Sequence, residues 1–103
     1  MNADESAQLL KEIENLLEKQ IELARRGSYG KLLRLAGQCE ALVAKTTEAG
    51  LREKPEYKNA HDRLARLYND LQLLLLTQQN AAAEQIKLIR KGEKTLAAYR
   101  SNT

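Results

Sequence analysis

Few residues in this chain have side chains suited to catalysis, and they are scattered. The single histidine, His61, is the natural candidate for a general base or metal ligand, and the single cysteine, Cys39, for a nucleophile. The pattern places His61 on the flank of a helical segment with no cysteine or serine partner, so we expect an ordinary surface histidine. Cys39 repeats in phase with nearby leucines, where a small buried apolar residue is expected.

The sequence also lacks the short motifs that carry known chemistry. It contains no C-x-x-C, H-E-x-x-H, Walker loop or G-x-G-x-x-G. Carboxylates such as Glu12, Glu14 and Glu18 are spaced as surface ion-pair partners of Lys11 and Lys19. We therefore expect no enzymatic activity, no catalytic residues, no cofactor and no bound metal.

The composition is typical of a helical bundle. The chain has 103 residues, a size that suits one domain, and 43% of them are hydrophobic. It has no Phe, no Trp and one Pro, and Leu, Ala, Glu, Lys and Arg dominate, which are good helix formers and poor strand formers. The sequence predicts a single all-α domain over 1–103, folded as an antiparallel helical bundle.

The distribution of charge argues against nucleic-acid and membrane partners. The net charge is +3, but the 17 basic and 14 acidic residues are interspersed, and even the densest basic stretch, 87–94, contains Glu93. The longest apolar run, Leu73–Leu76, is far too short to cross a bilayer. The N-terminus lacks the features of a signal peptide, and a lone cysteine fits a reducing compartment. We expect a cytoplasmic protein with no nucleic-acid partner and no membrane insertion.

Two helices are predicted in the first half of the chain, over 6–26 and 28–49. Their apolar residues recur at helical spacing, with Asp4 or Ser6 as the candidate N-cap of the first. Arg25 and Arg26 precede Gly27, a typical helix stop, because cations oppose the negative end of the helix dipole and glycine accepts a positive φ. The apolar phase continues through 27–30, so one long helix kinked there, giving a kinked helical hairpin, is the alternative to a turn.

The third predicted helix, over 56–90, is the longest. Pro55 suits its first turn, and Lys91-Gly92 resembles the earlier stop. We expect 91–103 to form a short, mobile, partly helical tail. The face predicted to join the core comprises Tyr57, Leu64, Tyr68, Leu71, Leu75, Ala82, Ile86 and Ile89.

Two leucines in 71-LQLLLLTQQN-80 lie away from that core face. Leu73 points almost opposite to it, and Leu76 lies to one side. Single exposed leucines are common, and a central helix covered on several sides would also explain them. The functional interpretation is a groove for an amphipathic partner helix, in which Gln72 and Gln79 would hydrogen-bond without the desolvation cost of a charge.

Two segments resemble the flagellar export chaperones. The first is 17-LEKQIELARRGSYGKLLRLAGQCEALV-43, in which Gly27 and Tyr29 match the glycine and aromatic residue that follow the family's first helix. The second is 71-LQLLLLTQQNAAAEQIKLIRKGEKTLAAYR-100, in which Leu96 and Tyr99 match a T-L-x-x-Y-like ending. The chaperone of the filament-cap protein is the most similar member, and the hook–filament junction chaperone is more distant.

The resemblance implies a small non-enzymatic cytoplasmic bundle that binds the C-terminal helical region of the filament-cap protein. It also implies delivery of that client to the export ATPase complex of the flagellar type III apparatus, and in some bacteria binding to a flagellar transcription regulator. The predicted partner-binding residues are Leu73, Leu76, Gln72, Gln79, Leu96 and Tyr99. The alternative is a structural or adaptor bundle that self-associates through its extra leucine face.

Overall fold

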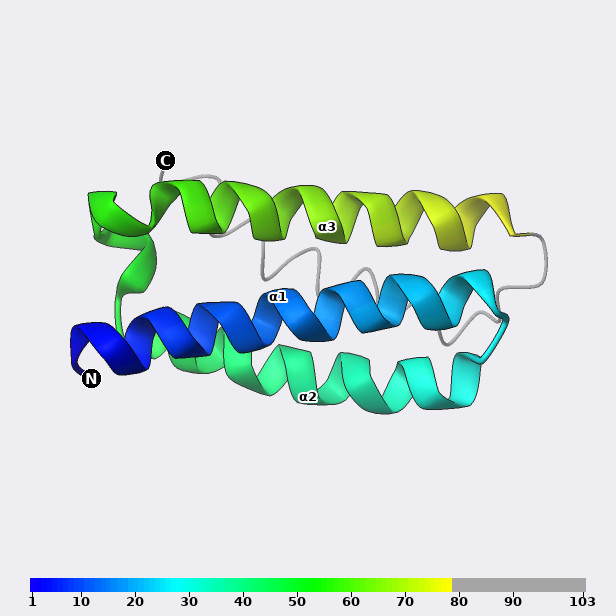
Figure 1. The fold of residues 1–103 in the computed structure, drawn as a ribbon, viewed down its shortest axis with the longest axis horizontal. Helices are drawn as coiled ribbons and strands as arrows, with labels where there is room; N and C mark the ends of the chain where they lie inside the picture. The colour runs from blue at the N-terminus through cyan, green and yellow to red at the C-terminus, as the bar shows by residue number, and fades with distance from the viewer. Residues whose placement is uncertain (79–103) are drawn as a thin grey trace.

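Three helices make up the part of the protein that the computed structural model describes, residues 1–78. They are α1 (Ala3–Arg25), α2 (Tyr29–Glu48) and α3 (Lys58–Thr77), and two 3₁₀ turns, η1 (Leu51–Glu53) and η2 (Pro55–Tyr57), connect the last two. The helices alternate in direction along the long axis, and α1 lies against both of the others (Figure 1). The predicted all-α antiparallel bundle is confirmed. Within residues 1–78, no helix is long and apolar enough to span a lipid bilayer.

Helix α1 begins earlier than predicted. Its N-cap is Asn2, whose Oδ1 accepts a hydrogen bond from the Glu5 backbone N–H at 2.8 Å. Asp4 and Glu5 then lie in the first turn, where negative charge complements the helix dipole. Ser6 is inside the helix and only 1% exposed. The predicted cap at Asp4 or Ser6 is therefore wrong, because asparagine caps a helix as well as either residue.

A turn at Gly27 separates α1 from α2. Gly27 has φ of 72°, the left-handed conformation that L side chains rarely adopt. The Ser28 N–H donates to the Leu23 carbonyl at 2.9 Å, and the Gly27 N–H donates to the Ala24 carbonyl at 3.1 Å. This pair of bonds is a Schellman motif, which closes the helix end. The structure thus has the predicted turn, and the kinked single helix is excluded.

Helix α3 ends well before the predicted boundary. Gln78 has ψ of 105°, an extended conformation, so the chain leaves the helix after Thr77. The Tyr29 hydroxyl donates a hydrogen bond of 2.8 Å to Gln78 Oε1, which ties this end of α3 to the start of α2. A single helix running from 56 to 90 is therefore wrong, and its first turn, at Pro55–Tyr57, is 3₁₀ rather than α. The predicted continuation over 79–90 and the tail over 91–103 lie outside the described residues.

The core runs along the inner face of α1, between α2 and α3. Ile13 and Leu17, in the middle of α1, are fully buried. Leu71 and Leu75 of α3 are 1% and 0% exposed. The buried cluster as a whole comprises Leu10, Ile13, Leu17, Leu23, Ala24, Leu32, Cys39, Val43, Leu51, Leu64, Tyr68, Leu71 and Leu75. The core therefore uses one face of each helix and leaves the outer faces available.

Candidate partner-binding site

The leucines near the end of α3 divide between the core and the surface. Leu71 and Leu75 are buried, and Leu74 is half-buried and packed against the core. Leu73 and Leu76 are 61% and 54% exposed. We call Leu73 and Leu76 the outer leucine pair. The sequence placed both away from the core face, and the structure confirms that placement.

The stretch of α3 that carries the outer leucine pair is uncharged, and the exposed Asp70 lies just before it. From Leu71 to Gln78 the sequence carries only leucine, glutamine and threonine, and the last charged residue before it is Asp70. Gln72 is half-buried on the same helix, whereas Gln79, Leu96 and Tyr99 lie outside the described residues. The structure therefore shows three of the six predicted partner-binding residues, all on the last two turns of α3.

Cys39 contributes to the core, as predicted. Its side chain is 0% exposed, and its Sγ lies 3.6 Å from the Tyr68 hydroxyl of α3. Burial raises the pKa of the Cys39 thiol, because the thiolate would lose its hydration. A buried thiol with a raised pKa is a poor nucleophile, so Cys39 packs α2 against α3.

His61 is buried, contrary to the prediction of a surface histidine. It is 6% exposed and lies on the buried face of α3 with Leu64 and Tyr68. Desolvation lowers the pKa of His61 below 6.5, and the charges of Asp62 and Glu53 partly oppose that shift. The sequence contained the signal: 61, 64, 68, 71 and 75 alternate in steps of three and four. The polar residue type, rather than the spacing, led to the wrong prediction.

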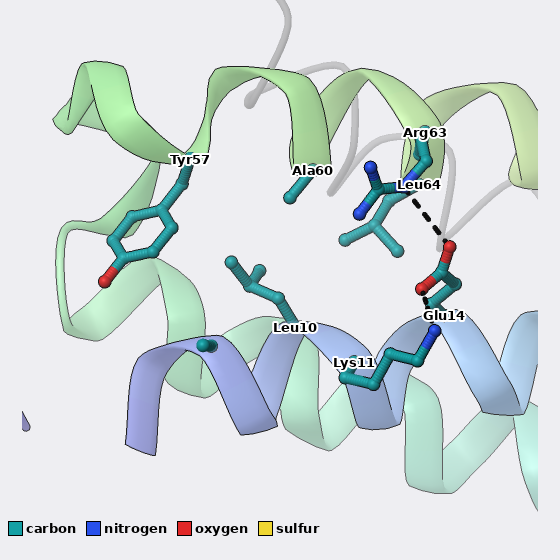
Figure 2. A pocket seen from close by; sticks show the side chains of 8 residues that line it. Leu10, Lys11, Glu14, Tyr57, Ala60, Arg63 and Leu64 are labelled. Atoms are coloured by element: carbon teal, nitrogen blue, oxygen red, sulfur yellow. Dashed lines mark hydrogen bonds and ion pairs between the residues drawn. The ribbon is translucent and has the colours of Figure 1, made fainter. Parts of the chain in front are cut away.

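A small pocket between α1 and α3 is a feature that the sequence did not indicate. It encloses about 160 Å³, and Leu10, Ala60 and Leu64 supply apolar walls beside the Tyr57 ring (Figure 2). This volume suits one benzene-sized group. The pocket lies at the opposite end of α3 from the outer leucine pair, since its α3 residues are 60, 63 and 64.

Glu14 joins the two helices at the edge of that pocket. Its Oε2 accepts a hydrogen bond from Lys11 Nζ at 3.0 Å, and its Oε1 forms an ion pair with Arg63 Nε at 3.3 Å (Figure 2). The hydrogen bond from Lys11 is the main cause of a lowered pKa for Glu14, and Arg63 adds to it. Glu14 therefore stays ionised near neutral pH and holds α3 against α1. The sequence predicted only a surface pair within α1 and missed the ion pair with Arg63, because that contact depends on tertiary packing.

The described residues provide no arrangement of metal-binding side chains. Within residues 1–78, no three His, Cys, Asp or Glu side chains gather closely enough to hold a metal ion. Among residues 1–78, the exposed outer leucine pair is the surface that best matches the predicted partner-binding site. Comparison of the chain with known protein families, curated proteins and solved structures gave no match.

Proposed function

We propose that the chain binds an apolar helix of a partner protein on the outer leucine pair and acts as a chaperone for that partner. The observation that carries this proposal is the exposure of Leu73 and Leu76, at 61% and 54%, next to buried Leu71 and Leu75. Residues three apart on a helix lie on neighbouring positions of its surface, so the pair presents a continuous apolar contact. An amphipathic helix is the partner that such a contact fits.

The size of the contact suits reversible binding. Burying a fully exposed leucine side chain contributes about 1.5–3 kcal/mol, and a little over half of each outer leucine remains to be covered. The pair therefore contributes about 2–3 kcal/mol, or roughly 30- to 150-fold in affinity. A chaperone must release its client, so a contribution of this modest size suits it. Neighbouring contacts would supply the rest of the binding free energy.

The resemblance to flagellar export chaperones suggests which client to test. We propose the C-terminal helical region of the filament-cap protein as this client. The chaperone would shield it from premature assembly and deliver it to the export ATPase complex. A flagellar transcription regulator is a further proposed partner. The uncharged surface over Leu71–Gln78 supports an apolar client face but does not distinguish among helical clients.

Calorimetric titration with the isolated C-terminal region of the filament-cap protein tests this function. We expect the unmodified chain to bind it, and the double variant Leu73→Glu/Leu76→Glu to raise Kd at least about 30-fold. Asn59→Glu is the control for added negative charge, because it places one carboxylate at an exposed position near the other end of α3. Absence of binding to the unmodified chain overturns the choice of client. Equal binding by the double variant overturns the site.

The alternative function, an adaptor that self-associates through the outer leucine pair, rests on the same exposed side chains. In that case Leu73 and Leu76 of two copies would cover one another. Sedimentation equilibrium distinguishes the two functions, because only the alternative predicts that Leu73→Glu/Leu76→Glu abolishes self-association.

A further inference from the structure

Four exposed charged residues recur at intervals of seven along α1 and its C-cap. They are Glu5, Glu12, Lys19 and Arg26, and all four are exposed. Residues seven apart lie two turns apart on nearly the same side of a helix, so these four form one stripe. We call them the charged stripe. Its first half is acidic and its second half is basic, and its midpoint falls between Asn15 and Leu16.

The central part of the charged stripe borders an apolar groove between α1 and α2. The two helices run side by side (Figure 1). The groove has a volume of about 510 Å³, with Leu16 of α1 and Ala41 and Leu42 of α2 as its apolar lining. Leu16 and Leu42 are only partly buried, so the groove leaves apolar surface uncovered. Glu12 and Lys19 also line it.

We propose that this groove and its charged stripe form an interface with a second copy of the chain. A two-fold axis between Asn15 and Leu16 would place the two α1 helices antiparallel. Glu12 of each copy would then face Lys19 of the other, and Leu16 would pack near the axis. The interface is self-complementary, as a two-fold contact requires.

The charges at the centre of the stripe are available for such pairing. Within residues 1–78, neither Glu12 nor Lys19 takes part in an ion pair. They lie about 10 Å apart along the helix, since each residue adds 1.5 Å, so they are too far apart to neutralise one another. At the end of the stripe, Arg26 is bonded to Glu22 at 3.0 Å and would contribute less.

The order of the charges also selects against other arrangements. Two copies with parallel α1 helices would set Glu12 against Glu12 and Lys19 against Lys19, which is unfavourable. An unrelated partner helix would need a basic residue opposite Glu12 and an acidic residue opposite Lys19. A second, antiparallel copy of α1 already provides both. The outer leucine pair lies on α3 and takes no part, so client binding and self-association use separate surfaces.

Charge reversal with mixing of variants tests the proposal on the full chain. Sedimentation equilibrium at low salt should show a dimer for the unmodified protein. Glu12→Lys alone and Lys19→Glu alone should each raise the dimer dissociation constant at least tenfold, because each turns two attractive contacts into two repulsive ones. High salt should reduce this difference.

An equimolar mixture of the two single variants should recover the dimer, since every contact across the axis is again attractive. A mixture that stays monomeric overturns the proposal, and so does an unmodified chain that stays monomeric at millimolar concentration. Loss of the dimer in Leu73→Glu/Leu76→Glu also overturns it, since that result places the interface on α3. Circular dichroism of each variant, at positions that are all exposed, verifies that the fold is retained.

Discussion

Introducing a glutamate at position 71 should destabilise the fold strongly, whereas introducing one at position 73 should leave its stability nearly unchanged. Leu71 is 1% exposed and lies in the core, whereas Leu73 is 61% exposed, two residues further along the same helix. Both substitutions add the same side chain to the same turn of α3, so helix propensity and charge change equally. Only the environment of the side chain differs between them.

The burial of Leu71 sets the size of the expected difference. Leu71→Glu removes a buried apolar side chain, which costs about 2–5 kcal/mol when leucine is truncated, and adds a carboxylate without a partner in the core. Domains of this size are stable by about 5–15 kcal/mol, so this variant should be largely unfolded or strongly destabilised. Leu73→Glu should change the free energy of unfolding by less than about 1 kcal/mol, as is usual for an exposed position.

Urea and thermal unfolding, followed by circular dichroism, measure both effects. A change of 1 kcal/mol shifts Tm by roughly 4–8 °C in a domain of this size. Leu73→Glu should therefore stay within several degrees of the unmodified protein, and Leu71→Glu should show no cooperative transition or a far lower Tm. Similar destabilisation by the two variants would refute the reasoning, since Leu73 would then be part of the core and unavailable to a client.

Three further predictions concern the interior. The Cys39 thiol should react with a thiol reagent at least about a hundredfold more slowly in the native protein than in urea, since it is buried and its pKa is raised; equal rates would contradict this placement. The free energy of unfolding should fall as the pH drops below 6.5, because the lowered pKa of His61 makes the unfolded chain take up a proton first. Urea titrations at a series of pH values measure this dependence. The free energy of unfolding should change less steeply with pH for His61→Leu than for the unmodified protein, and an unchanged pH dependence would exclude His61 as the cause. Tyr29→Phe should cost about 0.5–1.5 kcal/mol and speed amide exchange near Gln78, because it removes the hydrogen bond that ties the end of α3 to α2; unchanged exchange there would mean that the bond does not hold this end.

The features predictable from the sequence are those set by contacts between residues close together in the chain. The turn at Gly27 is one example, because a left-handed residue after Arg25-Arg26 needs only local hydrogen bonds. The split between Leu71 and Leu73 is another, since the helical period alone puts them on different sides of α3. The all-α class and the exposed position of the outer leucine pair follow from the same periodicity.

The tertiary structure decided what depends on how the helices rotate and pair. Helix α3 ends at Thr77 with no glycine or proline to mark the place, and the bond that holds Gln78 there comes from Tyr29, 49 residues away. The link from Glu14 to Arg63 likewise joins α1 to α3. Periodicity gives the direction in which a side chain points on its own helix. Which side chain meets it from another helix depends on the relative rotation and axial offset of the two helices, which no local pattern encodes.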